Sequence, residues 1–127
     1  MTRAARVCTV LLAPMLATAG CAVSAVPSSG PVAVYPTPDL GMDALLTGTL
    51  RLSGGCVVVD GGAGEAAVPV FPSGDIAWDE DSRRLTWRGE SYLDGDPISL
   101  GGGYGLPDGG YVPEACGNRE TFLVSPR

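Results

Sequence analysis

The sequence predicts an all-β fold, a small closed or partly open antiparallel barrel or sandwich of short strands. The chain has 127 residues with 19 glycines and 11 prolines, and both residue types favour turns and short strands over long helices. Apolar side chains alternate with polar ones over short segments, and turn residues separate these segments. A flat sheet of such strands would bury little core and leave two open edges, so closure is favoured.

The first predicted strands follow from this alternation. Segment 45–52, LLTGTLRL, places Leu46 and Leu50 on one face and its threonines on the other. Segment 56–60, CVVVD, is a β-branched run, as expected for a buried strand. Segment 66–71, AAVPVF, follows after a glycine-rich turn and is the next predicted strand.

The clearest hairpin signal lies at 76–88, IAWDEDSRRLTWR, where a polar centre separates two alternating segments. Pairing about that centre sets Trp78 opposite Leu85 and Ile76 opposite Trp87. All four side chains then share one face, where cross-strand packing is favourable. We therefore expect this hairpin to contribute to the core.

Three later segments complete the predicted fold: 91–96 (SYLDGD), 97–103 (PISLGGG) and a final strand at 121–125 (TFLVS). Apolar residues of these strands make up the predicted core. Its members are Leu50, Leu52, Val57, Val59, Val68, Val70, Ile76, Trp78, Leu85, Trp87, Ile98, Leu100, Phe122 and Val124.

The N-terminal segment has the layout of an export signal. Arg3 and Arg6 form a short positive region, and the apolar run 7–17 follows it. That run is shorter than the roughly 20 apolar residues that a membrane-spanning helix needs. Residues 1–20 are therefore predicted to be a signal peptide and are excluded from the fold.

The stretch TAGC, residues 18–21, resembles the lipobox of bacterial lipoproteins. In that family the cysteine receives a diacylglycerol, and cleavage just before it creates a new N-terminus that can carry a further fatty acid such as palmitate. The resemblance implies lipid attachment at Cys21 and a protein held on the extracytoplasmic face of a cell membrane. The domain that follows is similar to small β domains of actinobacterial lipoproteins.

Other interpretations of this segment stay open. The stretches ATA at 17–19 and VSA at 23–25 also suit ordinary signal-peptidase cleavage, which would give a soluble secreted protein, and an uncleaved segment is a third possibility. Residues 21–40 are predicted to be the lipidated cysteine and a Pro/Ser-rich flexible linker, and 41–127 the β domain. The alternative for the linker is a loose strand at 32–35 that lies on the domain.

Four cysteines are divided between the N-terminal segment and the domain. Cys8 leaves with the signal peptide and Cys21 carries the lipid if the resemblance holds, so Cys56 and Cys116 remain. An exported domain matures in an oxidising compartment, and these two are therefore expected to form a disulfide. Two buried free thiols are the alternative.

Charge and residue types exclude several functions. The net charge is −6, histidine is absent, and all eight basic residues are arginine. A nucleic-acid binder needs a basic face that neutralises phosphates, so nucleic acid is not an expected partner. Without histidine and lysine, Ser-His-Asp, Cys-His and Schiff-base catalysis are not available. We expect no catalytic residue, no metal site and no cofactor.

Acidic residues remain as candidates for chemistry. DED at 79–81 and DGD at 94–96 are typical of solvated turns, and the second stretch lacks the later ligands of an EF-hand calcium loop. Hydrolysis by a carboxylate pair needs two acids about 5–10 Å apart in a cleft. The acids that a barrel rim could bring together are Asp75, Asp79, Glu90 and Asp94.

Segment 101–118 is predicted to be a long mobile loop, and such loops are often functional. It begins with GGGYG, but the helix and lysine of a phosphate cradle do not follow. Its tyrosines, Tyr104 and Tyr111, make it the best candidate for a contact surface.

The expected function is that of a membrane-anchored extracytoplasmic lipoprotein. We expect a non-enzymatic binding or envelope-associated module for an unknown protein or small-molecule ligand, with the membrane as a partner through Cys21. A soluble secreted β domain is the first alternative, and a small carboxylate-dependent hydrolase is the second.

Overall fold

The computed structural model describes residues 26–126, whose regular structure consists of strands and one short 3-10 helix. This confirms the all-β prediction. No helix within these residues is long and apolar enough to cross a membrane. The elements are β1 (Ala33–Tyr35), β2 (Ala44–Ser53), β3 (Cys56–Gly62), β4 (Glu65–Pro72), β5 (Ile76–Asp79), β6 (Arg84–Trp87), β7 (Glu90–Tyr92), β8 (Pro97–Tyr104), η1 (Glu114–Cys116) and β9 (Thr121–Val124).

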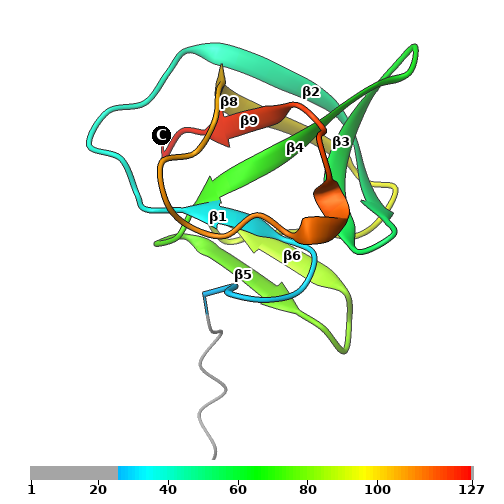
Figure 1. Cartoon of the computed structure of the whole chain (residues 1–127). Coiled ribbons are helices and arrows are strands. Elements are labelled where there is room, and N and C mark those ends of the chain that lie inside the picture. The colour runs from blue at the N-terminus through cyan, green and yellow to red at the C-terminus, as the bar shows by residue number, and fades with distance from the viewer. Residues whose placement is uncertain (1–25, 127) are drawn as a thin grey trace, which may run out of the picture.

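Five of the strands close a barrel in the order β2-β3-β4-β9-β8, and β8 pairs back to β2 (Figure 1). Neighbouring strands run antiparallel except β4 and β9, which are parallel. Thus β2, β3 and β4 form a meander, β8 returns to the first of them, and β9 fills the gap between β8 and β4. This is the strand order of Greek-key barrels of the OB type.

The long strand β2 pairs with two neighbouring strands. Its first half pairs with β8 and its second half with β3, and the change of partner occurs at Thr49. At the adjacent Gly48, a Cβ atom would lie 2.3 Å from the carbonyl oxygen of Asp60. Glycine is therefore required where the strand bends and another backbone comes close. Leu46 and Leu50 face the core from this strand, as predicted.

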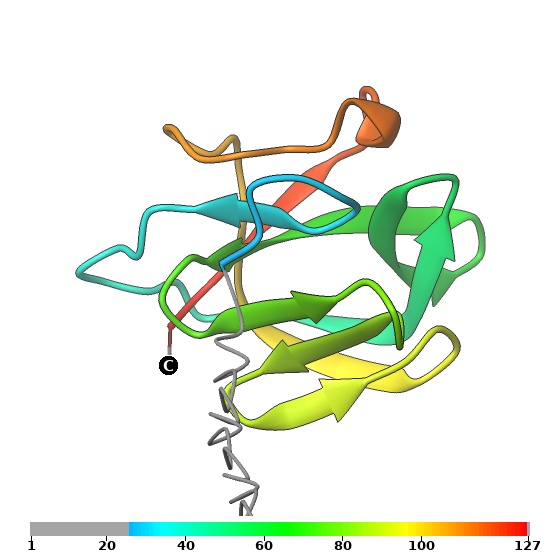
Figure 2. The same ribbon diagram turned by 90° about the horizontal axis from the view of Figure 1, so that it is seen from below.

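The second sheet, β5-β6-β7, follows β4 and closes one end of the barrel. Its hairpin has the predicted register, with Trp78 opposite Leu85 and Ile76 opposite Trp87. Ile76, Leu85 and Trp87 are buried in the same cluster as the barrel interior, and the Trp87 ring packs against Phe71 with centroids 5.3 Å apart. In Figure 1 β5 and β6 lie below the barrel strands. Figure 2 shows the strands of the second sheet, coloured green to yellow, side by side.

The predicted core is buried except at two positions, but Val68 and Val70 belong to a second cluster on the outer face of the barrel. Leu52 and Trp78 are only partly buried and pack against the edge of the core cluster. The prediction missed Phe71, which is fully buried at the end of β4, where the second sheet covers the barrel. It also missed the side chains of β1, which are buried with the core.

The prediction of a flexible linker up to residue 40 is wrong for residues 31–35. β1 is buried along its whole length and pairs in parallel with β4, where Ala33 lies opposite Val70. The Tyr35 hydroxyl donates a hydrogen bond of 2.7 Å to the carbonyl oxygen of Val124. The domain therefore begins near residue 31, and the alternative of a strand on the domain describes this segment.

The predicted loop 101–118 also begins too early. β8 continues to Tyr104, and Gly102 lies opposite Ala44 of β2 and opposite Val124 of β9. A Cβ atom on Gly102 would lie 2.0 Å from the carbonyl oxygen of Leu123, so a glycine must stand where β8 passes from one partner to the next. The glycine-rich composition that suggests a loop is here a requirement of barrel closure.

Candidate binding site at the barrel mouth

The end of the barrel opposite the second sheet carries an open groove of about 570 Å³. β4 runs from Glu65 at this end to Pro72 at the other, where the chain enters the second sheet. We call this feature the mouth groove. Apolar residues of three strands, Leu46, Val59 and Ala67, line it together with Leu45, Glu65, Tyr104 and Glu120. Its volume lies in the range of roughly 300–1,000 Å³ that is typical of small-molecule sites.

Small residues leave this end of the barrel unfilled. The β3–β4 hairpin carries Gly61, Gly64 and Ala66 at the groove, whereas Phe71 and Trp87 fill the opposite end. The hairpin turn between Gly62 and Glu65 matches the turn that the sequence predicts at this point. The mouth is thus open because the side chains that would fill it are absent from this hairpin.

The lining combines an apolar floor with a wider rim. Leu46, Val59 and Ala67 are buried, and they form the floor. Leu45 and Tyr104 are 70% and 53% exposed and stand at the rim. The Tyr104 ring meets Phe122 edge-on, with centroids 5.2 Å apart and an angle of 84°. This aromatic contact holds Tyr104 in a defined orientation beside the groove.

Two carboxylates share the groove. Glu65 begins β4 and Glu120 directly precedes β9, so the parallel pairing of these strands brings both to one end of the barrel. Both residues are exposed. The groove has no arginine among the described residues that line it. Its potential is therefore negative.

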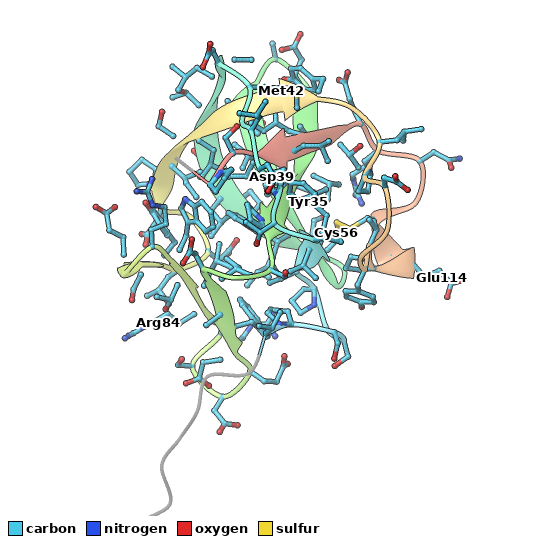
Figure 3. The ribbon with its side chains drawn as sticks, turned by 90° about the vertical axis from the view of Figure 1, so that its left-hand side faces the viewer. Tyr35, Asp39, Met42, Cys56, Arg84 and Glu114 are labelled. Carbon is cyan, nitrogen blue, oxygen red and sulfur yellow. A yellow bond between two sulfur atoms is a disulfide. The ribbon has the colours of Figure 1, made fainter. Side chains whose placement is uncertain are left out.

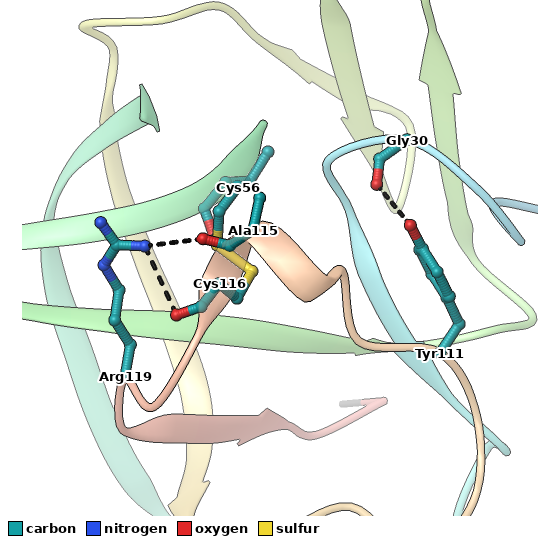
Figure 4. The surroundings of a disulfide bond; sticks show 7 residues. Gly30, Cys56, Tyr111, Ala115, Cys116 and Arg119 are labelled. Atoms are coloured by element: carbon teal, nitrogen blue, oxygen red, sulfur yellow. Dashed lines mark hydrogen bonds between the residues drawn. A yellow bond between two sulfur atoms is a disulfide. The ribbon is translucent and has the colours of Figure 1, made fainter. Parts of the chain in front are cut away.

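The structure separates the two tyrosines of the predicted contact loop. Tyr104 stands at the mouth groove, but Tyr111 is half-buried against β1. The backbone of Tyr111 exchanges two hydrogen bonds of 2.8 Å with Val34, and its hydroxyl donates to the carbonyl oxygen of Gly30 (Figure 4). The connection from β8 to β9 is thus fastened to the domain at Tyr111, which is not a contact residue of the mouth groove.

A disulfide joins Cys56 of β3 to Cys116 of η1, as predicted, and fastens the same connection a second time (Figure 4). The Arg119 guanidinium donates hydrogen bonds to the carbonyl oxygens of Ala115 and Cys116. In Figure 3 Tyr35 and Cys56 lie among the strands, and Glu114 of η1 lies at the periphery. A second apolar cluster forms beneath this cover and consists of Ala33, Tyr35, Cys56, Val58, Val68, Val70 and Cys116.

This covered surface is the outer face of β3 and β4. In OB-type barrels the corresponding strands and the adjoining loops are the usual ligand-binding face. Here β1 and η1 occupy it, and its side chains are buried. The mouth groove, in contrast, is open to solvent.

The four acids proposed for a carboxylate pair do not line the mouth groove. Asp79 accepts hydrogen bonds from the backbone N–H groups of the β5–β6 turn, and Asp94 accepts one from the backbone of Leu52. Glu90 accepts a hydrogen bond from the Tyr92 hydroxyl. Burial, this hydrogen bond and the Glu90 charge raise the pKa of Tyr92. Asp75 is exposed at the start of the hairpin.

The predicted lipid-attachment residue, Cys21, lies outside the described residues. Within residues 26–126 no three metal-ligating side chains are grouped together. The sequence prediction missed Leu45, Glu65 and Glu120 as site residues. No local motif marks them, because Glu65 stands in a hairpin turn and Glu120 in a loop, and barrel closure alone brings them together.

The fold and the groove define a small disulfide-linked β-barrel that is plugged at one end and open at the other. No protein-family model matches this chain, and no curated protein or solved structure matches it significantly.

Proposed function

We propose that this protein is a membrane-anchored extracytoplasmic lipoprotein whose barrel is a non-enzymatic binding module, with the mouth groove as its ligand site. The observation that carries the binding role is the groove itself, an open concavity in which exposed apolar, aromatic and acidic side chains surround a buried apolar floor. Small-molecule sites commonly combine these features, and the mouths of β-barrels are frequent locations for them. The side face that could compete as a site is covered.

Support for the anchor comes from the sequence and from the disulfide. The export-signal layout is followed by TAGC, and residues 22–30 connect Cys21 to the domain. The Cys56–Cys116 disulfide suits an oxidising compartment outside the cytoplasm. Two acyl chains on one residue hold a protein stably on a membrane, whereas one chain gives marginal binding.

Mass spectrometry of the mature N-terminus tests the anchor. We expect the chain to begin at Cys21, to carry a diacylglycerol and to fractionate with membranes. Cys21→Ser should abolish the lipid, and Cys8→Ser, the matched control, should leave it in place. A lipid-free mature chain that begins at Gly20 or Val26 would show instead a soluble secreted protein.

A fragment screen tests the binding role. The mature lipidated protein, purified in mild detergent, is exposed to mixtures of small cationic, neutral and anionic fragments while backbone amide shifts are recorded by NMR. We expect the binding fragments to shift the amides of Gly61, Gly64 and Tyr104, which line the mouth groove. Binding fragments that cluster elsewhere on the surface and leave these amides unchanged would contradict the proposed site.

A further inference from the structure

From the mouth groove we infer the class of ligand: an amphipathic organic cation, in which an ammonium or guanidinium group is joined to an apolar body. The inference rests on the proposed binding role of the groove. Three features carry it together: the two carboxylates that line the groove, the oriented tyrosine and the exposed apolar side chain of Leu45.

The carboxylates require a positive partner. Glu65 and Glu120 both line the groove without an arginine beside them in the lining. A ligand that fills the groove removes water from these carboxylates, and this is costly unless the ligand supplies hydrogen-bond donors or a positive charge. Residues 26–126 hold all 14 acids of the chain and five of its eight arginines, so the surrounding field also attracts cations.

Tyr104 provides a second contact for a cation. Its ring is about half exposed at the groove, and its contact with Phe122 fixes the ring orientation. A cation above an aromatic face is attracted by the ring quadrupole. The ring and the two carboxylates line the same groove and favour the same sign of charge.

The exposed apolar surface of the groove favours an organic cation over a metal ion. Leu45 and the Tyr104 ring are exposed at the groove and offer apolar surface that a hydrocarbon body can cover. A calcium ion needs six to eight oxygen ligands, and two glutamates beside an aliphatic floor do not provide them. An anion would meet two carboxylates of like charge. The ligand that matches both parts of the groove is therefore charged at one end and apolar at the other.

Three probes of the same shape test the inference. The mature lipidated protein in mild detergent is titrated at pH 7 with benzylammonium, benzyl alcohol and benzoate, and binding is followed through the amides of Gly61, Gly64 and Tyr104. We expect benzylammonium to bind about threefold to tenfold more tightly than benzyl alcohol, as weak ion pairing with exposed carboxylates and contact with the Tyr104 ring allow. Benzoate should bind more weakly than both other probes. Added salt should weaken the binding of benzylammonium, because it screens the attraction to the carboxylates.

Matched variants test which residues cause the preference for benzylammonium over benzyl alcohol. The double variant Glu65→Gln/Glu120→Gln should lower the preference for benzylammonium over benzyl alcohol at least about twofold, because only the Tyr104 ring then favours the cation within the groove. Asp108→Asn removes an exposed carboxylate that does not line the groove and should preserve the preference. Tyr104→Phe keeps the ring and should preserve the affinity for benzylammonium, whereas Tyr104→Leu should lower it about threefold.

The outcomes separate the inference from the proposed function. If the three probes shift the groove amides with equal affinity, the ligand class is wrong and the binding site stands. A preference for benzylammonium that is as large in the double glutamine variant as in the wild type also overturns the inference. If neither these probes nor the screened fragments shift the groove amides, and binding occurs elsewhere, both proposals fail.

Discussion

At the scale of single residues, Tyr35 shows how one side chain holds a short strand in place. β1 has three residues, and Tyr35 ends it with a ring in the outer apolar cluster. Its hydroxyl reaches across to the Val124 carbonyl oxygen on β9 in a buried hydrogen bond of 2.7 Å. Burial raises the pKa of Tyr35 above the ordinary 10.0, because the phenolate would lose its hydration. The neutral phenol is therefore the form that stabilises the fold.

We expect Tyr35→Phe to lower the free energy of unfolding by about 1–3 kcal/mol, since it leaves a buried carbonyl oxygen without its partner. Denaturant unfolding at pH 7 measures this loss. Above about pH 10 the unfolded tyrosine ionises while folded Tyr35 keeps its proton, so wild-type stability falls as the pH rises. The difference in the free energy of unfolding between the wild type and Tyr35→Phe should then become smaller. A difference that stays constant from pH 7 to 11 would contradict this role.

At the scale of elements, the connection between β8 and β9 covers the side of the barrel. Tyr111 fastens it to β1, and Cys116 in η1 fastens it to β3. The apolar cluster beneath it includes Val58, Val68 and Val70, which would otherwise be exposed on the outer face. The disulfide therefore links the meander to the segment before the last strand and keeps a second core closed.

The double variant Cys56→Ser/Cys116→Ser should lower the free energy of unfolding by about 4 kcal/mol, the chain-entropy value for a cross-link that spans 60 residues. Denaturant unfolding measures the change, and Ala115→Ser, at an exposed position of the same 3-10 helix, serves as the control. Reduction of the wild-type protein avoids introducing serine hydroxyls and should have the same effect. Reduction should also increase the binding of an apolar dye, because the outer apolar cluster beneath the β8–β9 connection becomes exposed. Unchanged stability after reduction would argue against the structural role of the disulfide.

At the scale of the whole molecule, the two ends of the barrel differ in kind. The second sheet plugs one end, and the mouth groove opens at the other. The described chain begins at the plugged end, where residues 26–30 share a groove with Trp78 and Glu80. Figure 1 shows this entry beside β5. An anchor at Cys21 would therefore hold the plugged end toward the membrane and direct the mouth groove away from it.

This orientation can be measured on the lipidated protein in vesicles that contain spin-labelled lipid headgroups. The label broadens nearby amide signals, and we expect stronger broadening at Arg84 in the second sheet than at Tyr104 at the groove. Arg84 lies at the periphery of that sheet in Figure 3. Lipid-free protein provides the control, and equal broadening at both residues would contradict the orientation.

The sequence by itself determined the features that depend on neighbouring residues. Alternation with a period of two predicted the faces of β2, and the polar centre of the hairpin predicted the pairing of Trp78 with Leu85. The export-signal layout, together with the cysteine positions, led to the Cys56–Cys116 pair. Each of these inferences needs only local spacing or a short inventory of one residue type.

Tertiary structure alone decided the closure of the barrel and everything that closure brings together. Glu65 and Glu120 lie far apart in the sequence and meet at one mouth because β4 and β9 pair in parallel. Gly102 has the local appearance of a loop residue, yet a strand crossing leaves no space there for a side chain. Such positions were not predictable from spacing, because their environment is made by strands that are distant along the chain. The mouth groove is therefore a property of the closed barrel, and no segment of the sequence contains it.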